Sequence, residues 1–394
     1  MVRVLIGGVI ALALAMGVGR FAFTPILPAM LAATGLETDG AGFIASLNYL
    51  GYFLGALGAA LVPRGTVRTA TFRAALVASV ATTAGMGLTE DFTAWSVLRF
   101  VSGLASGFIF VLGVAMVLDA LARAGREAWT GWLYTGIGLG IASSGLFVML
   151  LGEGVGWRGD WLWLGLICTV TGMASWLWVT DPPEAGTAAS KPVGTAPGGI
   201  LSAPLLLLTL AYFLEGGGYI VSGTFLVAIL KSAPDTVALG DAAWVIAGLV
   251  CMPSGLIWAA AGRRLGLWRA LILAHLVQAA GILLPMLGSP VAGLLSAASF
   301  GGTFVGIVML SFTLGRRLSG GAAARVVGAM TSAYGLGQIL GPLPAGIAVA
   351  RTGSYDTALI GAAAAVVIGA ALLAAGSWIT RRPSPTTGEF PCRT

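Results

Sequence analysis

Three charged side chains lie inside long apolar runs of the sequence, and their types could do chemistry there. They are Arg20 in "GVGRF", Arg99 in "RFVSG" and Glu215 in "LEGGG". A guanidinium is effectively always charged, and placing it in hydrocarbon costs several kcal/mol. A carboxylate withdrawn from water binds protons more readily and can titrate near neutrality. Such residues therefore indicate binding of a charged solute, of protons, or of both.

The chemistry of Arg20 allows three interpretations. Its planar donors suit a carboxylate, so it could bind an anionic group of a substrate. It could instead pair with Glu215 as a gate or proton-coupling switch that a proton or substrate opens. It could also be structural, satisfied by backbone carbonyls near Pro25 and Pro28, because proline cannot continue the helical hydrogen-bond ladder. The sequence alone leaves the three open.

Glu215 is the only acidic residue deep in an apolar run, which makes it the candidate proton carrier, together with Arg20 and Arg99. The same carboxylate could hold a substrate amine, or be a permanently neutral packing residue. The glycines after it could let the helix unwind or approach a neighbour closely. Further polar side chains are expected to contact the substrate, although each could equally make an interhelical hydrogen bond. Beside Arg20, the candidate substrate-binding residues are Tyr219, Asn48, Tyr52, Tyr134, Tyr334 and Gln338.

The composition indicates which elements position these residues. The chain has 394 residues, of which 57% are hydrophobic and 9% charged, against about 25% charged in soluble domains. The mean hydropathy is +0.95, and the 60 glycines suit closely packed membrane helices. These values predict an all-α integral membrane protein.

Apolar runs of roughly 20 residues, separated by short polar turns, predict twelve transmembrane helices in two six-helix bundles. The longest polar interruption separates six runs from six. We therefore expect an N-terminal bundle over 1–180, a cytoplasmic linker over 181–202, a C-terminal bundle over 203–380 and a cytoplasmic tail over 381–394. The expected spans are 4–32, 41–62, 71–89, 93–118, 128–151, 160–179, 203–230, 241–261, 269–287, 291–314, 323–349 and 356–379.

The distribution of basic residues predicts the orientation. With both termini inside, one set of loops and tails collects sixteen Lys and Arg residues, and the opposite set holds only Arg158, Lys231 and Arg351. This positive-inside bias places both termini in the cytoplasm of a multi-pass plasma-membrane protein, with a bacterial inner membrane as the expected location. The basic clusters are then neighbours of anionic lipid rather than sites for nucleic acid.

The two halves also show an internal repeat. A shift of 199 residues places "GVGRFAFTPILP" (17–28) over "GGGYIVSGTFLV" (216–227) and Arg20 over Tyr219. The same shift pairs Arg64 with Arg263 and several glycines with glycines. Parallel repeats of this kind characterise a transporter architecture with the substrate site between the halves.

At this point the sequence resembles the major facilitator superfamily along nearly its whole length. "GALGAALVPRGTVRTATFR" (55–73) resembles that family's Gly- and Arg-rich cytoplasmic loop, although it lacks the usual acidic residue. "RFVSG" is similar to the fourth-helix motif and "GLGQILGPLPAG" (335–346) to a Gly-Pro motif. "GVGRFAFTPILPAM" and "YFLEGGGYIVSGTFLVAIL" look like the YbfB/YjiJ-type branch. The resemblance implies that helices one, four, seven and ten line a central cavity, which would bring Arg20, Arg99 and Glu215 toward it.

We therefore expect a proton-coupled secondary transporter that works by alternating access. The excess of cavity arginines favours an organic anion or zwitterion, such as a carboxylate or an amino-acid-like compound. An efflux pump for hydrophobic or drug-like compounds and a non-translocating membrane sensor or scaffold are the alternatives. No enzyme is expected, because the sole histidine, His275, has no nucleophile partner. The scattered cysteines imply neither metal nor cofactor, and the protein is expected to be monomeric.

Overall fold

The first apolar run, which could cross the membrane once, folds as an interrupted helix rather than as one regular α-helix. The computed structural model describes residues 1–181, 202–319 and 323–381, and every regular element in these ranges is helical. Helix α1 (Val2–Leu12) continues into a π-helical turn, η1 (Ala13–Val18), and α2 (Phe23–Ala33) follows after four residues. Arg20 lies in this break.

The other helices follow the remaining apolar runs. The N-terminal half, residues 1–181, continues with α3 (Thr38–Ala59), α4 (Thr66–Gly85), α5 (Phe92–Arg123), α6 (Thr130–Leu133) and α7 (Thr135–Trp178). The C-terminal half, residues 202–381, contains α8 (Ala203–Lys231), α9 (Gly240–Leu265), α10 (Leu267–Leu283), α11 (Pro290–Leu318), α12 (Ala323–Leu340), α13 (Pro342–Thr352) and α14 (Asp356–Arg381).

Within the described ranges, ten helices are long and apolar enough to cross a membrane. The expected span 71–89 lies largely in α4, which is not among the ten because two arginines and five threonines lower its hydropathy. The expected spans 128–151 and 160–179 fall within one 52-residue helical stretch, Glu127–Trp178. Gly156 interrupts it with a φ of 67°, a left-handed conformation that favours glycine.

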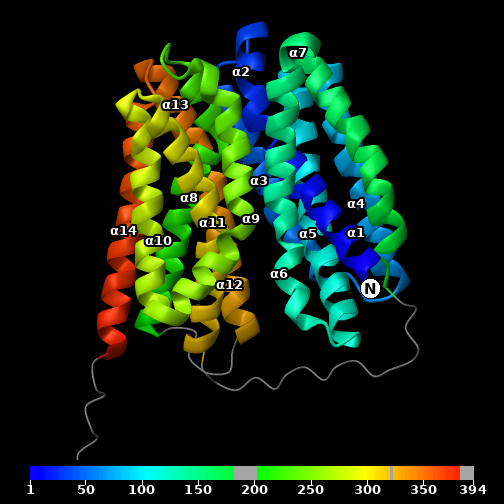
Figure 1. Ribbon diagram of the computed structural model, residues 1–394, viewed down its shortest axis with the longest axis vertical. Helices are drawn as coiled ribbons and strands as arrows, with labels where there is room; N and C mark the ends of the chain where they lie inside the picture. The colour runs from blue at the N-terminus through cyan, green and yellow to red at the C-terminus, as the bar shows by residue number, and fades with distance from the viewer. Residues whose placement is uncertain (182–201, 320–322, 382–394) are drawn as a thin grey trace, which may run out of the picture.

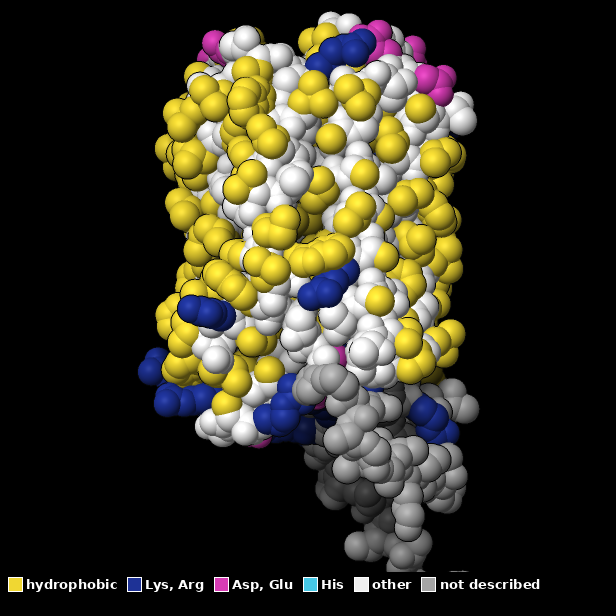
Figure 2. All heavy atoms as spheres, turned by 90° about the vertical axis from the view of Figure 1, so that its right-hand side faces the viewer, with side chains coloured by type: hydrophobic (Ala, Val, Ile, Leu, Met, Phe, Trp, Pro, Cys, Tyr) yellow, Lys and Arg dark blue, Asp and Glu magenta, His cyan; other side chains and the backbone are white. Residues whose placement is uncertain are grey.

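The two halves lie side by side, and α2 of the N-terminal half and α9 of the C-terminal half lie at the boundary between them (Figure 1). On the face shown in Figure 2, apolar side chains cover the middle of the molecule. On that face most Lys and Arg side chains lie toward one end, and the Asp and Glu side chains lie mainly at the other (Figure 2). The expected linker 181–202 and tail 381–394 lie outside the described residues apart from Asp181, Ser202 and Arg381.

The halves are hydrogen-bonded to each other at their middle and at the end occupied by the upper turns of α2 and α3 (Figure 1). Thr24 Oγ1 donates to the carbonyl of Gly223, and Thr38 Oγ1 lies 3.5 Å from the carbonyl of Gly346. Thr24 and Gly223 are separated by 199 residues, the period of the sequence repeat. Contact between such equivalent positions is expected near the axis that relates two parallel repeats.

Candidate functional site

The break in the first helix exposes backbone carbonyls that need new partners. The amide of Gly19 donates to the carbonyl of Leu14 over 2.8 Å, and the amide of Phe21 to that of Met16 over 3.2 Å, each five residues back. The amide of Thr24 turns to Phe21, only three residues back. This irregular bonding ends the regular ladder just before Pro25.

Arg99 of α5 satisfies the carbonyls at the break. Its Nη1 donates to the carbonyl of Gly19 over 2.7 Å and its Nη2 to that of Arg20 over 2.8 Å. Ser102, one turn further along α5, also donates to the carbonyl of Gly19. In this structure Arg99, and not Arg20, donates to free backbone carbonyls of the first helix, and the carbonyls are those of Gly19 and Arg20 rather than carbonyls next to Pro25 and Pro28. The guanidinium of Arg20 is left free for a different contact.

The Arg20 side chain lies on aromatic rings at the boundary between the halves. Its Cζ is 4.2 Å from the ring centroid of Tyr52, 4.8 Å from that of Tyr49 and 5.3 Å from that of Phe21. Its Nη2 donates to Gln338 Oε1 of α12, across the boundary, over 2.7 Å. Rings attract a desolvated cation, but each contributes only about 0.5–2 kcal/mol. The surroundings hold the guanidinium in place without neutralising it.

No carboxylate balances this charge in the part of the chain that the structure describes. Arg20 is 2% exposed, and its Nε has no hydrogen-bond partner. None of the four ion pairs in the described ranges involves it, so the hypothetical pair between Arg20 and Glu215 is absent from this state. A buried, unbalanced guanidinium is costly. An anion entering the site would offset that cost.

Close helix packing brings the partner of Arg20 into place. A Cβ on Gly216 of α8 would lie 2.7 Å from the carbonyl of Tyr334, and a Cβ on Gly337 of α12 would lie 2.1 Å from the carbonyl of Phe213. Only glycine permits this approach. It brings Gln338 to α8, where its Nε2 donates to the hydroxyl of Tyr219. The amide of Gln338 thus joins Arg20 to its repeat equivalent, Tyr219.

Glu215 lies apart from Arg20, on the side of α8 that faces α10. Helix α8 is continuous through the glycines after Glu215, so they serve close packing rather than unwinding. The carboxylate is fully buried and lies close to the side chain of Gln278, but among the described residues no hydrogen bond of regular geometry reaches either oxygen. Gln278 donates to Thr303 over 3.1 Å, and its own Oε1 is unpartnered.

The remaining candidates divide into aromatic and structural residues. Tyr334 stacks 4.2 Å from Tyr212, and Tyr134 lies 6.5 Å from Phe110, both measured between ring centroids. Asn48 donates to the carbonyl of Arg99 over 2.8 Å, a contact within the N-terminal half.

Three further residues contribute to this region. Phe21 and Tyr49 hold the guanidinium of Arg20, and Tyr49 also lies 3.3 Å from Thr224 Oγ1 across the boundary. Gln278 is the polar neighbour of Glu215. In the sequence Phe21 directly follows Arg20, and Tyr49 lies three residues before Tyr52, one turn away on α3. No local signal in the sequence marks Gln278, because it belongs to a distant helix.

A separate charge cluster lies at the N-terminal end of α4. Arg68 pairs with Asp119 over 2.8 Å and with Asp181 over 2.7 Å, and the amide of Gly65 also donates to Asp181. The missing acidic residue of the loop is thus supplied from other parts of the chain. Burial raises the pKa of Asp181, but Arg68 and Gly65 outweigh burial and lower it below its usual 3.8. The pair contributes stability at neutral pH, which is lost only as the pH falls through that lowered pKa.

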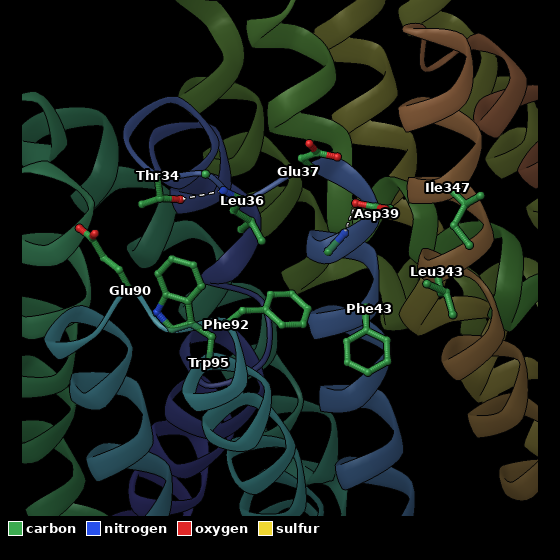
Figure 3. Close-up of a pocket in the computed structure, with 12 residues that line it drawn as sticks. Thr34, Leu36, Glu37, Asp39, Phe43, Glu90, Phe92, Trp95, Leu343 and Ile347 are labelled. Carbon is green, nitrogen blue, oxygen red and sulfur yellow. Dashed lines mark hydrogen bonds between the residues drawn. The ribbon is translucent and has the colours of Figure 1, made fainter.

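A surface pocket of about 710 Å³ opens at the end of the molecule near the start of α3 (Figure 3). Phe43, Phe92 and Trp95 lie along its wall, with Glu37 and Asp39 above them (Figure 3). Glu90, which also lines it, is paired with Arg158 over 2.7 Å. None of the residues lining this pocket contacts Arg20 or Glu215 through a hydrogen bond or ion pair in the described ranges.

Comparison with known proteins gives one family and one fold. The family model described as "Uncharacterised MFS-type transporter YbfB" matches residues 12–374. A crystal structure of a single-residue mutant of nucleoside transporter NupG superimposes with a TM-score of 0.77 at 14% identity, covering 94% of this chain and 99% of the other. A second NupG structure has a TM-score of 0.72, also at 14% identity, over 96% and 99%. No curated protein sequence matches the chain.

Proposed function

Because the chain belongs to the YbfB-type family of major facilitator transporters, we propose that it is a secondary transporter that carries an organic anion or zwitterion on Arg20. Transporters of this fold bind their substrates between the two halves, near the bilayer midplane. Arg20 lies at that boundary and donates across it to Gln338. The single observation that carries the proposal is the buried guanidinium that no carboxylate balances among the residues that the structure describes.

The geometry of Arg20 favours a carboxylate over other anions of similar charge. Nε and Nη2 lie on one edge of the guanidinium, where two parallel donors match the two oxygens of a carboxylate. Gln338 occupies Nη2, and Nε is unpartnered. A carboxylate that takes this edge would satisfy Nε and compete with Gln338 for Nη2. Replacement of Gln338 would also break a hydrogen bond between the halves, which links binding to their relative motion.

Glu215 is the proposed proton site. None of the ion pairs in the described ranges includes it, and burial of a carboxylate without a cation favours its neutral form. Proton exchange at this residue as the halves move would couple transport to the proton gradient. Arg99 acts in this scheme by fixing the backbone that carries Arg20.

The proposed membrane arrangement has twelve crossings, with bundles over 1–180 and 203–380. It rests on the ten apolar helices, on α4 as a less apolar span, and on the interruption of α7 at Gly156. Both termini would lie in the cytoplasm of a bacterial inner membrane, in line with the basic residues at one end of Figure 2. The protein is proposed to act as a monomer.

Ligand-dependent thermal unfolding of the purified protein tests the anchor role of Arg20. A carboxylate present at 100 times its dissociation constant should stabilise the folded state by about 2.7 kcal/mol. We expect organic carboxylates to raise the melting temperature of the unmodified protein and to lose that effect in Arg20→Gln. The matched control is Arg158→Gln, which removes a surface arginine paired with Glu90 and should leave ligand stabilisation unchanged.

The contrary outcome is equally specific. If neutral nucleosides or hydrophobic cations stabilise unmodified protein and Arg20→Gln alike, while carboxylates stabilise neither, Arg20 is no substrate anchor. Stabilisation by hydrophobic cations would then favour the efflux alternative, and stabilisation by nucleosides would favour a transporter of uncharged polar solutes.

A further inference from the structure

Half-buried aromatic side chains from both halves lie near Arg20. They indicate whether the substrate contains an aromatic ring. Tyr52 of α3, Phe110 of α5 and Tyr134, just before α7, belong to the N-terminal half, and Tyr334 of α12 belongs to the other. Each of the four rings packs against the hydrophobic core and is only partly buried. Rings that stay partly uncovered at the boundary are available to a bound molecule.

The N-terminal rings follow one another from Arg20. The guanidinium lies on the ring of Tyr52, 4.2 Å from its centroid. Tyr52 is 6.3 Å from Phe110 at an interplanar angle of 61°, and Phe110 is 6.5 Å from Tyr134 at 52°. These distances and tilts are those at which aromatic rings attract one another edge to face. The cation therefore stands at one end of a continuous aromatic surface.

The C-terminal half contributes the ring of Tyr334, which stacks nearly parallel to two tyrosine rings of α8. Tyr334 lies 4.2 Å from Tyr212 at 16° and 5.7 Å from Tyr219 at 13°. Tyr219 in turn lies 5.7 Å from Phe304 at 12°. Stacking on buried neighbours fixes the orientation of Tyr334, so its ring is preorganised rather than adjustable.

Helices α3 and α12, which carry Tyr52 and Tyr334, are in direct contact at the boundary. A Cβ on Gly335 of α12 would lie 2.7 Å from the Phe53 ring of α3. Tyr334 directly precedes Gly335 in the chain, and Tyr52 directly precedes Phe53. An anion held by Arg20 at this point would have aromatic rings from both halves around its remaining part.

We propose that the substrate is a planar aromatic carboxylate, whose carboxylate binds the Nε–Nη2 edge of Arg20 and whose ring lies against Tyr52 and Tyr334. This inference rests on the proposed function and adds the aromatic ring to it. A flat ring can stack on both surfaces and has few torsions to immobilise. A saturated ring of the same size is thicker and lacks the quadrupole that orients aromatic pairs.

Matched pairs of acids test this inference on the full chain in detergent. Benzoate, phenylacetate and 1-naphthoate would be titrated by calorimetry beside their ring-saturated counterparts, which keep the carboxylate. Two aromatic contacts should make the aromatic member of a pair bind about tenfold more tightly. The preference should be reduced in Tyr334→Leu and retained in Tyr334→Phe, which keeps the ring. Every acid should lose binding in Arg20→Gln.

The outcomes separate this inference from the proposed function. If aromatic and saturated acids bind equally and both require Arg20, the aromatic inference is wrong and the carboxylate anchor stands. If no acid binds, or binding survives in Arg20→Gln, the anchor itself is overturned and the ring preference with it. The comparison of acids on unmodified protein needs no variant, so it decides the matter even if Tyr334→Leu folds poorly.

Discussion

At the scale of single residues, two buried arginines lie next to each other in space and do different work. Arg99 donates to the carbonyls of Gly19 and Arg20, whereas the guanidinium of Arg20 has one amide oxygen and three rings. The difference predicts that Arg99→Lys, which keeps the charge but loses the two-carbonyl fork, costs about 2–4 kcal/mol of stability. Arg20→Lys should cost less and instead weaken ligand binding.

Chemical unfolding in detergent, followed by tryptophan fluorescence, measures both changes. If Arg20→Lys destabilises the fold as much as Arg99→Lys and binds carboxylates normally, the division of roles between the two arginines is wrong.

Glu215 carries a prediction at the same scale. Gln is nearly isosteric with a protonated Glu, so Glu215→Gln should fold normally while losing the ability to exchange a proton. In proteoliposomes we expect exchange of substrate across the membrane to persist and pH-driven accumulation to be lost. An inward sodium gradient at constant pH serves as the control.

Undiminished pH-driven accumulation in Glu215→Gln would contradict the proposed role of Glu215 as the proton site. Accumulation that follows sodium in unmodified protein and disappears in Glu215→Gln would also contradict it, and would make the carboxylate a sodium ligand.

At the scale of helices, the contact between α3 and α13 depends on glycines. A Cβ on Gly42 would lie 2.4 Å from the carbonyl of Pro342, a backbone atom that cannot move alone. Gly42→Ala should therefore push the halves apart at this end and shift the equilibrium toward the alternative state. Gly361→Ala is the matched control, since a Cβ there meets nothing within 4 Å and alanine favours a helix.

The accessibility to an impermeant maleimide of a cysteine introduced at Ala45, which is buried one turn along α3 from Gly42, reports this shift. Faster labelling in Gly42→Ala than in Gly361→Ala is expected, and equal rates would show that the contact does not control the opening of that end.

The helices also show which parts of the structure could be predicted from the sequence. Apolar runs and basic loops predicted the helical membrane fold, because hydropathy is a local property. The break at residues 13–22 was not predicted, since it depends on Arg99 reaching across from α5. Likewise, Gln338 was identified as a polar candidate, but its position between Arg20 and Tyr219 requires the glycine contacts of α8 and α12.

At the scale of the whole molecule, the hydrogen bonds between the halves join residues 20–49 to residues 223–346. Transport requires these bonds to break in turn, whereas a sensor or scaffold could keep them. Spin labels at Glu37 and Arg351 would measure the distance across the halves, and labels at Glu37 and Glu90 a distance within one half. The three native cysteines, Cys168, Cys251 and Cys392, would first be replaced.

We expect the pair across the halves to show one short distance without ligand and an added, longer population with a bound carboxylate at low pH. A ligand can shift the two states only by its differential affinity for them, so a carboxylate that displaces Gln338 should act where a neutral analogue does not. The pair within one half should stay constant. A single unchanged distance across the halves, with ligand binding intact, would contradict alternating access and favour a protein that binds its ligand without moving it across the membrane.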